Sequence, residues 1–577
     1  MQVIDPITIE VIRNYLLSAA REMNRNLVRT AYSTTIYEVH DFGVGIYDRQ
    51  CRLLAEAPGL AIFTRGNDFA LRKIVDYLGY ENIHPEDIIL LNYPYWSAAH
   101  TLDVTAVSPI YHAGEIVGFS AVKQHWQDMG QKDPGYCTNT VDVFQEGLII
   151  PCLKIHKRGQ LNEDLVDIIR FNSRMPEHTL GDMNAKLSSC ITGRKRVEEL
   201  LEKFGPETYQ LATEQILDHG ERVARARLAE LPKGTWSAED WVDDDGIDKE
   251  TMVKIKATVT ISDDEMVVDF TGSDPATKGP INVPIGMTMG IGALVFKAIT
   301  TPDLPANDGN FRPLRVIAPP GSLMHAVAPA PTFTMWPALL AIDVVTKALA
   351  QAGPDVVPAC SGGDIFSVSG VGIHPRTGKL WHQGSNEGVG FGAHPGGDGE
   401  NVIMHPSEPG CRNNPIEVME TKAPIRIEFY GLRQDSGGAG QHRGGLGARR
   451  GVRYLADATA LNMVKKSKTK PWGMAGGHAG ANGYAIYWPD TEKEKVTGTN
   501  YQPVDAGDQV FNLSGGGGGW GNPFLREPAR ILEDVRNEYV SVESAQNVYG
   551  VVIDPATMTI DTAATEQLRS KNQSEKK

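Results

Sequence analysis

Hydrophobic residues in the first 230 positions recur at helical spacing in some segments and alternate in others. A helix is predicted over residues 6–31, where apolar residues recur every three or four positions. Alternation on both sides of a turn predicts a hairpin over 39–57. A second helix is predicted over 67–80, with Asn67 as its N-cap. Further elements are expected as strands over 87–93, 105–112 and 115–125, and as a helical region over about 162–230.

The hydrophobic pattern changes after residue 234. Two segments with a period of two, 252–261 and 265–272, are separated by a short polar turn and predict another hairpin. Glycine and proline then become dense and helical patterns scarce, apart from the apolar stretch 335–353, which predicts one buried helix.

These patterns predict a mixed α+β fold. We expect an N-terminal α/β domain over residues 1–234, followed by a mainly β, Gly/Pro-rich domain over 235–566. The polar residues 567–577 are expected to form a disordered tail. A chain of 577 residues is long enough for two or three such domains.

Composition and charge narrow the classes of function. The net charge of −15 disfavours binding to nucleic acid through phosphate neutralisation. The chain has no apolar run of about 18 residues and no signal-peptide pattern, so we expect a cytoplasmic protein without membrane association. The six cysteines are far apart and include no C-x-x-C pair, which argues against a disulfide framework or a structural zinc site.

Ligand-type side chains lie at the ends of several predicted strands. His100 and Asp103 follow the strand at 87–93, and His125 and Asp128 lie at and after the end of the strand at 115–125. Asp41 precedes another predicted strand. Each of them alone has an ordinary structural explanation, as a polar turn residue or a buried histidine. Together, imidazoles and carboxylates suit Zn²⁺, Mn²⁺ or Fe²⁺, so a shared metal site is the alternative hypothesis.

The glycine-rich segments do not predict a nucleotide site. In 513–524 the glycine run is followed by Trp-Gly-Asn-Pro, whereas a P-loop needs Lys and then Ser or Thr. We therefore expect an ordered structural loop. The segment 435–450 places Arg443 among glycines and could bind an anion, but no nucleotide motif follows it. The chain also has no G-x-S-x-G elbow, which leaves a nucleophile-first mechanism without support.

Several long motifs resemble one known family over nearly the whole chain. The motifs are "HDFGVGIYD", "NYPYWSAAHTLDVTAVSPIY", "HWQDMGQKDPG", "VFQEGLIIP", "VDFTGSDPATKGPINVP" and the closing "GGGGGWGNPFLREP". They resemble the hydantoinase B family, which comprises B subunits of ATP-dependent hydantoinases and caprolactamase, the corresponding half of 5-oxoprolinase, and subunits of acetone and acetophenone carboxylases.

The resemblance implies a metal centre in this chain and a second subunit. Zinc is the first expectation for the metal, with manganese or iron as alternatives. The metal ligands implied are Asp41, His100, Asp103 and His125, and the residues implied for the outer shell or for proton transfer are Asp128 and Glu146. The implied partner is a hydantoinase A-like ATPase that binds ATP and Mg²⁺, in an (αβ)₂ heterotetramer.

The resemblance further implies an ATP-dependent cyclic amide hydrolase that is active only with its partner. The partner would activate the carbonyl of a lactam, hydantoin or other cyclic amide by phosphorylation, and metal-bound water would attack it. A ketone carboxylase that uses bicarbonate is the alternative, and a non-catalytic scaffolding subunit is the second alternative. The chain departs from the family at Ala98 and Ala99 and over 58–67, which bears on the substrate rather than on the metal.

Overall fold

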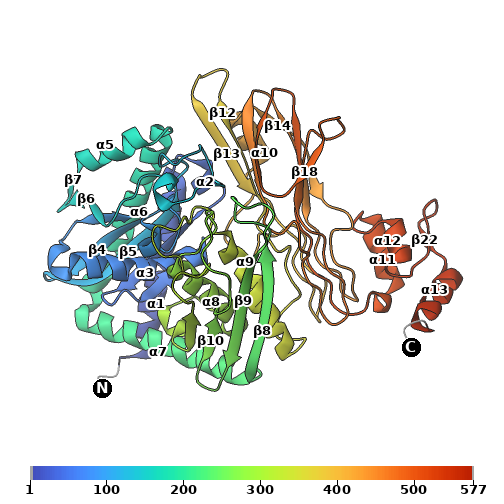
Figure 1. Cartoon of the computed structure of the whole chain (residues 1–577). Helices are drawn as coiled ribbons and strands as arrows, with labels where there is room; N and C mark the ends of the chain where they lie inside the picture. Colours follow the sequence, from blue (N-terminus) through green and yellow to red (C-terminus); the bar gives the residue numbers. More distant parts are fainter. Residues whose placement is uncertain (1–3, 575–577) are drawn as a thin grey trace. The chain divides into compact units, whose positions relative to one another are not determined.

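The structure of the chain, a computed structural model, describes residues 4–574 (Figure 1). Helices make up 34% and strands 24% of it, which confirms the predicted mixed α+β class. The chain forms two compact units. Unit 1 comprises Met1–Val345 with Ser407–Pro415, and unit 2 comprises Thr346–Pro406 with Ile416–Lys577.

A seven-stranded antiparallel sheet forms the centre of unit 1, in the order β2-β1-β5-β4-β3-β6-β7. The hairpin predicted over 39–57 and the three strands predicted between 87 and 125 are confirmed. The strands are β1 (Phe42–Asp48), β2 (Leu53–Glu56), β3 (Ile88–Leu91), β4 (Asp103–His112), β5 (Glu115–His125), β6 (Leu153–Lys157) and β7 (Gln160–Leu161).

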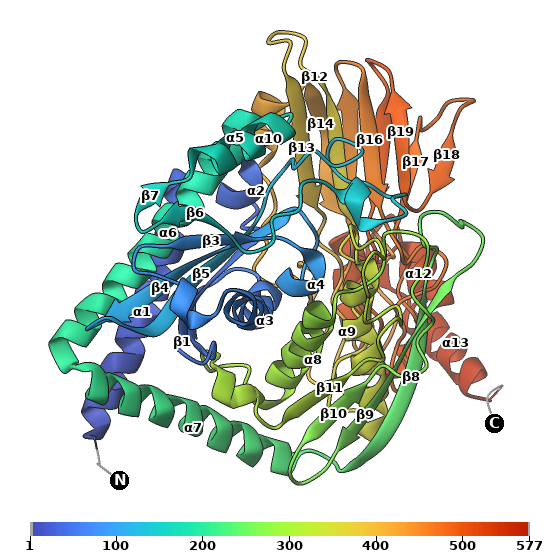
Figure 2. The same ribbon diagram turned by 60° about the vertical axis from the view of Figure 1, so that its left-hand side comes forward.

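Helices cover both faces of this sheet, as Figure 2 shows for α3 on one side and α6 on the other. Along β1, Phe42, Val44 and Ile46 join the apolar core that α1 and α6 complete. The residue between two of them, Gly43, faces α3, where a Cβ would lie 2.8 Å from the Cβ of Phe63. A strand that is buried on both faces has a nearly continuous run of apolar residues in its sequence. The helices are α1 (Pro6–Thr30), α2 (Thr34–Tyr37), α3 (Ala61–Leu78), α4 (Pro94–Ser97), α5 (Glu163–Asn172), α6 (Pro176–Phe204) and α7 (Pro206–Glu230).

The start of α3 differs from the prediction. The helix begins at Ala61, so Asn67 is buried inside it and is not an N-cap. Residues 61–66 have the helical spacing of apolar side chains, but the glycine at 66 weakens that signal. A glycine is needed at this position of the helix, because a Cβ there would lie only 2.8 Å from the Nζ atom of the buried Lys123.

Unit 1 also contains a four-stranded sheet with the order β11-β10-β9-β8 and two buried helices. The hairpin predicted over 252–272 and the buried helix predicted near 335–353 are confirmed. The elements are β8 (Gly234–Val242), β9 (Val253–Ile261), β10 (Met266–Asp269), α8 (Ile285–Thr300), β11 (Leu314–Ile317) and α9 (Trp336–Leu349). Short 3₁₀ helices of unit 1 cover Tyr80–Asn82, Val143–Glu146 and Asp308–Phe311, and another at Ala350–Ala352 belongs to unit 2.

Helix α8 was not predicted, and its glycines explain why. Gly286, Gly290 and Gly292 weaken the helical signal in the sequence. In the structure, a Cβ on Gly286 would lie 2.4 Å from the Cβ of Ala98, and one on Gly290 would lie 3.1 Å from a side-chain carbon of Ile62. The missing side chains therefore allow α8 to approach α3 and α4 closely.

The two compact units do not divide at residue 234, where we placed the boundary between the predicted domains. Strands β8 to β11, helix α8 and helix α9 as far as Val345 belong to unit 1. The change in the hydrophobic pattern at residue 234 marks a change from helices to strands within unit 1. The predicted tail also differs, because helix α13 (Thr562–Ser574) includes residues 567–574. Residues 575–577 lie outside the described part.

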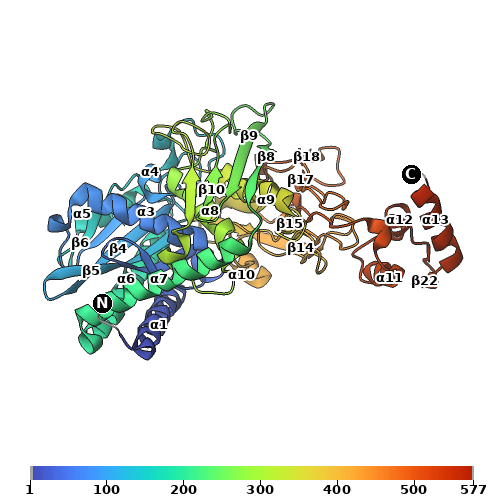
Figure 3. The same cartoon turned by 90° about the horizontal axis from the view of Figure 1, so that it is seen from below.

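Unit 2 contains two larger sheets with the orders β13-β12-β16-β19 and β14-β15-β20-β17-β18. Their strands are β12 (Ser367–Ile373), β13 (Leu380–Asn386), β14 (Ile425–Leu432), β15 (Ala448–Tyr454), β16 (Ala458–Met463), β17 (Tyr484–Tyr487), β18 (Lys495–Thr497), β19 (Asn500–Val504) and β20 (Gln509–Leu513). Figure 3 shows the last helices and the small hairpin grouped together. The remaining elements are α10 (Ile416–Lys422), a 3₁₀ helix (Pro523–Leu525), α11 (Pro528–Arg536), α12 (Val542–Asn547), β21 (Ile553–Asp554) and β22 (Thr559–Ile560).

The glycine run of unit 2 lies buried among other loops and forms what we call the glycine interior, Gly515–Gly519 with the carbonyls around it. The amides of four of its residues donate hydrogen bonds of 2.8–2.9 Å to carbonyls of Ala481, Gly445, Cys360 and His478. A Cβ on Gly517 would lie 1.9 Å from the carbonyl oxygen of Phe391. The run is thus an ordered structural loop, as predicted, and these four amides are already engaged by the protein.

All six cysteines are free and buried. Within the described part of the chain, none of the helices combines the length and the apolar character needed to cross a bilayer.

Candidate metal centre

The candidate site lies at one edge of the seven-stranded sheet, where three neighbouring strands begin or end. Asp103 is the first residue of β4 and pairs directly across the ladder with His125, the last residue of β5. Asp41 comes just before β1, and its carbonyl accepts a hydrogen bond from the His125 amide at 3.2 Å. Because β1, β5 and β4 are adjacent and antiparallel, their alternate ends meet at the same edge.

His100 reaches the same point from the turn before β4. The Asp103 amide donates to the His100 carbonyl at 3.1 Å, which closes the turn and brings the two side chains together. His100 Nε2 lies 3.1 Å from Asp103 Oδ2, and His125 Nδ1 lies 3.0 Å from Asp103 Oδ1. One ligand atom from each of these three buried residues falls within 4.8 Å of the others, which is the spacing of a metal site.

Asp41 is at the margin of this cluster. Its Oδ2 lies 4.0 Å from His125 Nδ1. Burial raises the pKa of Asp41 to about 8; His125 opposes the rise, whereas the carboxylates of Glu408 and Asp103 add to it. Burial opposes ionisation of Asp103 too, but the adjacent imidazoles of His100 and His125 hold its pKa below the usual value. The site therefore combines a carboxylate held in the charged form with a second carboxyl that a cation would ionise.

The donor set fits a divalent ion. Asp103 Oδ2 is buried and lies 3.1 Å from His100 Nε2, but it forms no hydrogen bond of good geometry among the described residues, so it retains the capacity to bind a cation. Two imidazole nitrogens and carboxylate oxygens are the usual ligands of Zn²⁺, Mn²⁺ and Fe²⁺, and they match the charge of a divalent ion. The structure brings His100, Asp103 and His125 together as the sequence predicted, with Asp41 next to them.

The other two predicted residues are outside this cluster. Asp128 is buried and forms an ion pair with Arg174, whose Nε lies 2.9 Å from Asp128 Oδ1. Glu146 is also buried and accepts hydrogen bonds from the amides of Thr332 and Phe333 at 2.8 and 2.9 Å. Burial raises the pKa of Glu146 to about 7, against the effect of these donors. Both carboxylates fix backbone segments near the site.

Sequence reasoning missed three residues beside the imidazoles. The ring of Tyr136 is stacked on His125, with centroids 5.6 Å apart, and Phe333 stands edge-on to His100 at 5.4 Å. Glu408 belongs to the segment Ser407–Pro415, which joins unit 1 from much later in the chain. Only Tyr136 had a signal in the sequence, since it directly follows the motif that carries His125.

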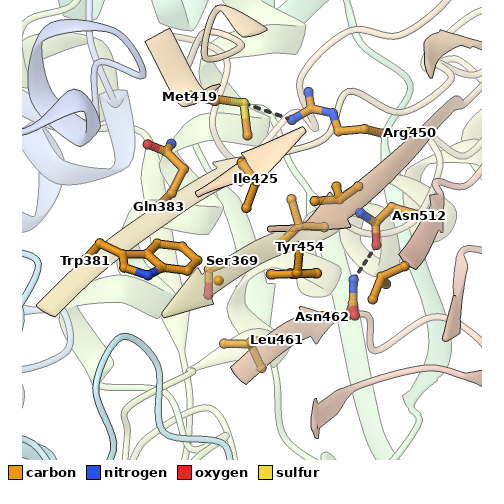
Figure 4. Close-up of a pocket in the computed structure, with 14 residues that line it drawn as sticks. Ser369, Trp381, Gln383, Met419, Ile425, Arg450, Tyr454, Leu461, Asn462 and Asn512 are labelled. Atoms are coloured by element: carbon orange, nitrogen blue, oxygen red, sulfur yellow. Dashed lines mark hydrogen bonds between the residues drawn. The ribbon is translucent and has the colours of Figure 1, made fainter. Parts of the chain in front are cut away.

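Unit 2 has its own small internal cavity, of about 20 Å³, lined by strand residues of its two larger sheets and by Met419 of α10 (Figure 4). Asn462 donates a hydrogen bond to Asn512, and the Arg450 guanidinium lies 3.4 Å from the Met419 sulfur. Arg450 also pairs with the buried Glu387 at 3.0 Å. The cavity has room for about one or two water molecules, and no group of metal-ligand residues lines it.

In the second glycine-rich segment, 435–450, the charged side chain of Arg443 is already paired within the protein. The guanidinium of Arg443 is buried, donates to the Gly444 carbonyl at 2.8 Å and faces Asp534 at 3.6 Å. An anion would have to displace these partners, so the structure gives no support to the predicted anion site around Arg443.

Fold and site together define a mixed α+β protein with a candidate metal centre at the edge of an antiparallel sheet. The chain belongs to the hydantoinase B/oxoprolinase family, whose model matches residues 5–523.

Two curated relatives are similar over the full length of the chain. The B subunit of a putative D-/L-hydantoinase of Pseudomonas sp. is 32% identical over 98% of both chains. The beta subunit of the caprolactamase of Pseudomonas jessenii is 30% identical over 99% of this chain and 100% of its own.

Solved structures have the same fold. A crystal structure of the ATP-dependent caprolactamase from Pseudomonas jessenii superposes with a TM-score of 0.90 at 28% identity, covering 99% of this chain and 100% of that one. A nucleotide-free acetone carboxylase structure superposes with a TM-score of 0.91 at 21% identity, covering 99% and 83%. The second likeness concerns the fold alone.

Proposed function

We propose that the chain is the metal-binding subunit of a heteromeric, ATP-dependent amidohydrolase that opens a lactam, a hydantoin or another cyclic amide. The observation that carries this proposal is the convergence of His100, Asp103 and His125 at one sheet edge in a member of the hydantoinase B/oxoprolinase family. Asp41 completes the proposed ligand set.

The partner and the nucleotide are inferred from the relatives and from the chemistry. The similar proteins are named as B or beta subunits, and caprolactamase is named as ATP-dependent. This chain has neither a P-loop sequence nor free amides in residues 516–519 of its glycine run. ATP and Mg²⁺ are therefore assigned to a hydantoinase A-like partner, in an (αβ)₂ assembly. Phosphorylation of an unstrained amide supplies the driving force that ring opening lacks.

The residues of this chain have distinct tasks in the proposed reaction. His100, Asp103 and His125, with Asp41, would hold a divalent ion, which would supply Lewis acidity to the reaction. Asp103 orients both imidazoles toward a common point through contacts of 3.0 and 3.1 Å. Glu146 and Asp128 act as positioning residues: Glu146 holds the segment that carries Phe333, and Asp128 anchors the turn after β5 to Arg174. Because the site is buried, bulk water does not weaken the electrostatic interactions within it.

Hydrolysis is preferred over carboxylation on the grounds of similarity. The hydantoinase and caprolactamase relatives are 32% and 30% identical, whereas the acetone carboxylase is 21% identical. A ketone carboxylase remains the second candidate because its fold is the same. A scaffolding role is less consistent with an intact cluster of buried ligand-type residues.

The test is reconstitution with the partner. The chain is co-purified with a hydantoinase A-like subunit and incubated with ATP, Mg²⁺ and a panel of cyclic amides, and ring-opened acid and ADP are quantified together. We expect ADP and acid to be formed only when both subunits are present, and about one divalent ion per chain by elemental analysis.

Other outcomes would decide against the proposal. Incorporation of labelled bicarbonate with a ketone, without amide opening, would favour the carboxylase. A metal-free complex that retains full amide hydrolysis would contradict the role given to His100, Asp103 and His125.

A further inference from the structure

Tyr136 lies directly over the candidate metal ligands. Its ring is nearly parallel to that of His125, with centroids 5.6 Å apart and planes 12° apart, and it also stacks on His100 at 6.0 Å and 28°. Phe333 closes the side of this group, edge-on to Tyr136 at 5.7 Å. The two imidazoles are therefore enclosed by one phenol and one phenyl ring, which come from segments far apart in the sequence.

The position of Tyr136 is held from two sides. The carbonyl of Gly135, the preceding residue, accepts a hydrogen bond from the buried Gln131 side chain at 2.9 Å. Gly135 has φ +80°, a conformation that favours glycine, so the turn that presents Tyr136 depends on it. On the other side, Phe333 is fixed by the hydrogen bond from its amide to Glu146. Such a ring is preorganised and not free to swing away.

The hydroxyl group of Tyr136 has a different setting from those of two other tyrosines in unit 1. Tyr47 donates to the Thr64 carbonyl at 2.8 Å, and Tyr111 donates to the Ile83 carbonyl at 2.6 Å. Among the described residues, no group forms a hydrogen bond with the Tyr136 hydroxyl. Burial raises the pKa of Tyr136, and the carboxylates of Asp41 and Asp103 add to this rise. The hydroxyl proton is therefore not used in a hydrogen bond within the described part of the chain.

We propose that Tyr136 is a catalytic residue of this site: its ring forms one wall of the substrate pocket, and its hydroxyl donates a hydrogen bond to the oxygen carried by the carbon under attack. The inference rests on the proposed amide hydrolysis. No bond to Tyr136 forms or breaks, and the phenol keeps its proton throughout. A fixed donor aimed at an oxygen on which negative charge develops stabilises the transition state more than the substrate.

The test compares Tyr136→Phe with Tyr111→Phe, which also loses a hydroxyl but at the other end of β4. In the complex with the partner, Tyr136→Phe should retain its metal and lose about 10²- to 10³-fold in kcat, with KM changed by less than about threefold. Tyr111→Phe should match the wild type. Full kcat in Tyr136→Phe, with an active wild type, would overturn the inference and leave the proposed function intact.

A second measurement does not depend on turnover. The full chain is loaded with Co²⁺ and titrated with acetate, whose carboxylate represents the oxygen of the product, and the visible band of the ion is followed. We expect Tyr136→Phe to keep the wild-type band before acetate is added and to bind acetate about tenfold more weakly, which corresponds to the loss of one hydrogen bond to a charged group. Equal affinity, or no response to acetate in the wild type, contradicts the inference. If the wild type takes up no Co²⁺, the metal centre and this inference fail together.

Discussion

At the sheet edge of unit 1, side chains from three strand ends and one turn surround a point where an ion can bind. In the glycine interior of unit 2, side chains are absent and backbone amides pair with carbonyls of other loops. In the proposed metal centre, His100 and Asp103 could be replaced only by other ligand residues. Gly517 could be replaced by nothing larger, since a Cβ would lie 1.9 Å from a carbonyl oxygen. The first region is specialised through its chemistry and the second through its packing.

The difference shows which signals in a sequence indicate function. A run of five glycines attracts a phosphate-binding interpretation, but the amides of four of them, residues 516–519, donate hydrogen bonds within the protein. A dispersed set of histidines and aspartates has a weak signature, yet its members occupy adjacent strand ends. Residues that can bind a ligand or a metal indicate function when the topology of the fold brings them together. They indicate it less when they are only adjacent in the sequence.

The largest effect on activity is expected when a candidate metal ligand at the sheet edge of unit 1 is removed. His100→Ala should abolish turnover of the reconstituted complex and lower metal content severalfold, because one of the two imidazoles is lost. The melting temperature should also fall in the metal-loaded protein, since metal binding is linked to folding. Elemental analysis, activity and calorimetry measure the three effects. His112→Ala, at the far end of the same strand β4, is the matched control and should leave all three unchanged. Full metal and activity in His100→Ala would show that the ligand assignment is wrong.

A smaller effect, confined to stability, is expected from the glycine interior. Gly517→Ala should destabilise unit 2 by about 3 kcal/mol or prevent its folding, because overpacking against backbone cannot be relieved by a rotamer change. The measurement is urea unfolding, with the yield of soluble protein as a second readout.

Gly431→Ala is the control for this comparison, since a Cβ on Gly431 meets nothing within 4 Å. Its stability should change by less than about 0.5 kcal/mol. If Gly517→Ala and Gly431→Ala were equally stable, the glycine interior would be less tightly packed than its geometry indicates.

The smallest effect concerns the pH dependence of stability through Glu146. Burial raises its pKa from 4.5 to about 7 in the folded state. The folded chain therefore holds a proton that the unfolded chain has lost, so the stabilisation is complete below pH 4.5 and is lost as the pH rises through about 7. The carboxamide of Glu146→Gln resembles the protonated acid at every pH, so the variant should lack this decline.

Calorimetry between pH 5 and 8 tests this difference. The stability of the wild type relative to Glu146→Gln should decrease with rising pH by at most about 3 kcal/mol. The exposed Glu250→Gln serves as a control and should follow the wild type. A constant difference between wild type and Glu146→Gln would mean that the hydrogen bonds from Thr332 and Phe333 keep Glu146 ionised.

What the sequence determined by itself is local. The alternation in β1, β4 and β5 and the ligand-type residues at their ends are readable because strand period and turn chemistry depend on neighbouring residues. The resemblance of long motifs added the family. A site shared by Asp41, Asp103 and His125 was a hypothesis at that level, and the order β1-β5-β4 in one sheet brings the three residues together.

Only the tertiary structure decided what surrounds the ligands. Tyr136 and Phe333 meet over the imidazoles, and Glu146 holds Phe333 from a position 187 residues away in the chain. Helix α8 and the glycine interior were also not readable, because glycines that look like loop residues are there to permit close approach. Long-range packing depends on partners that no local window contains. For that reason, the ligand-type residues at the strand ends could be predicted from the sequence, whereas the residues that pack around them became known only from the structure.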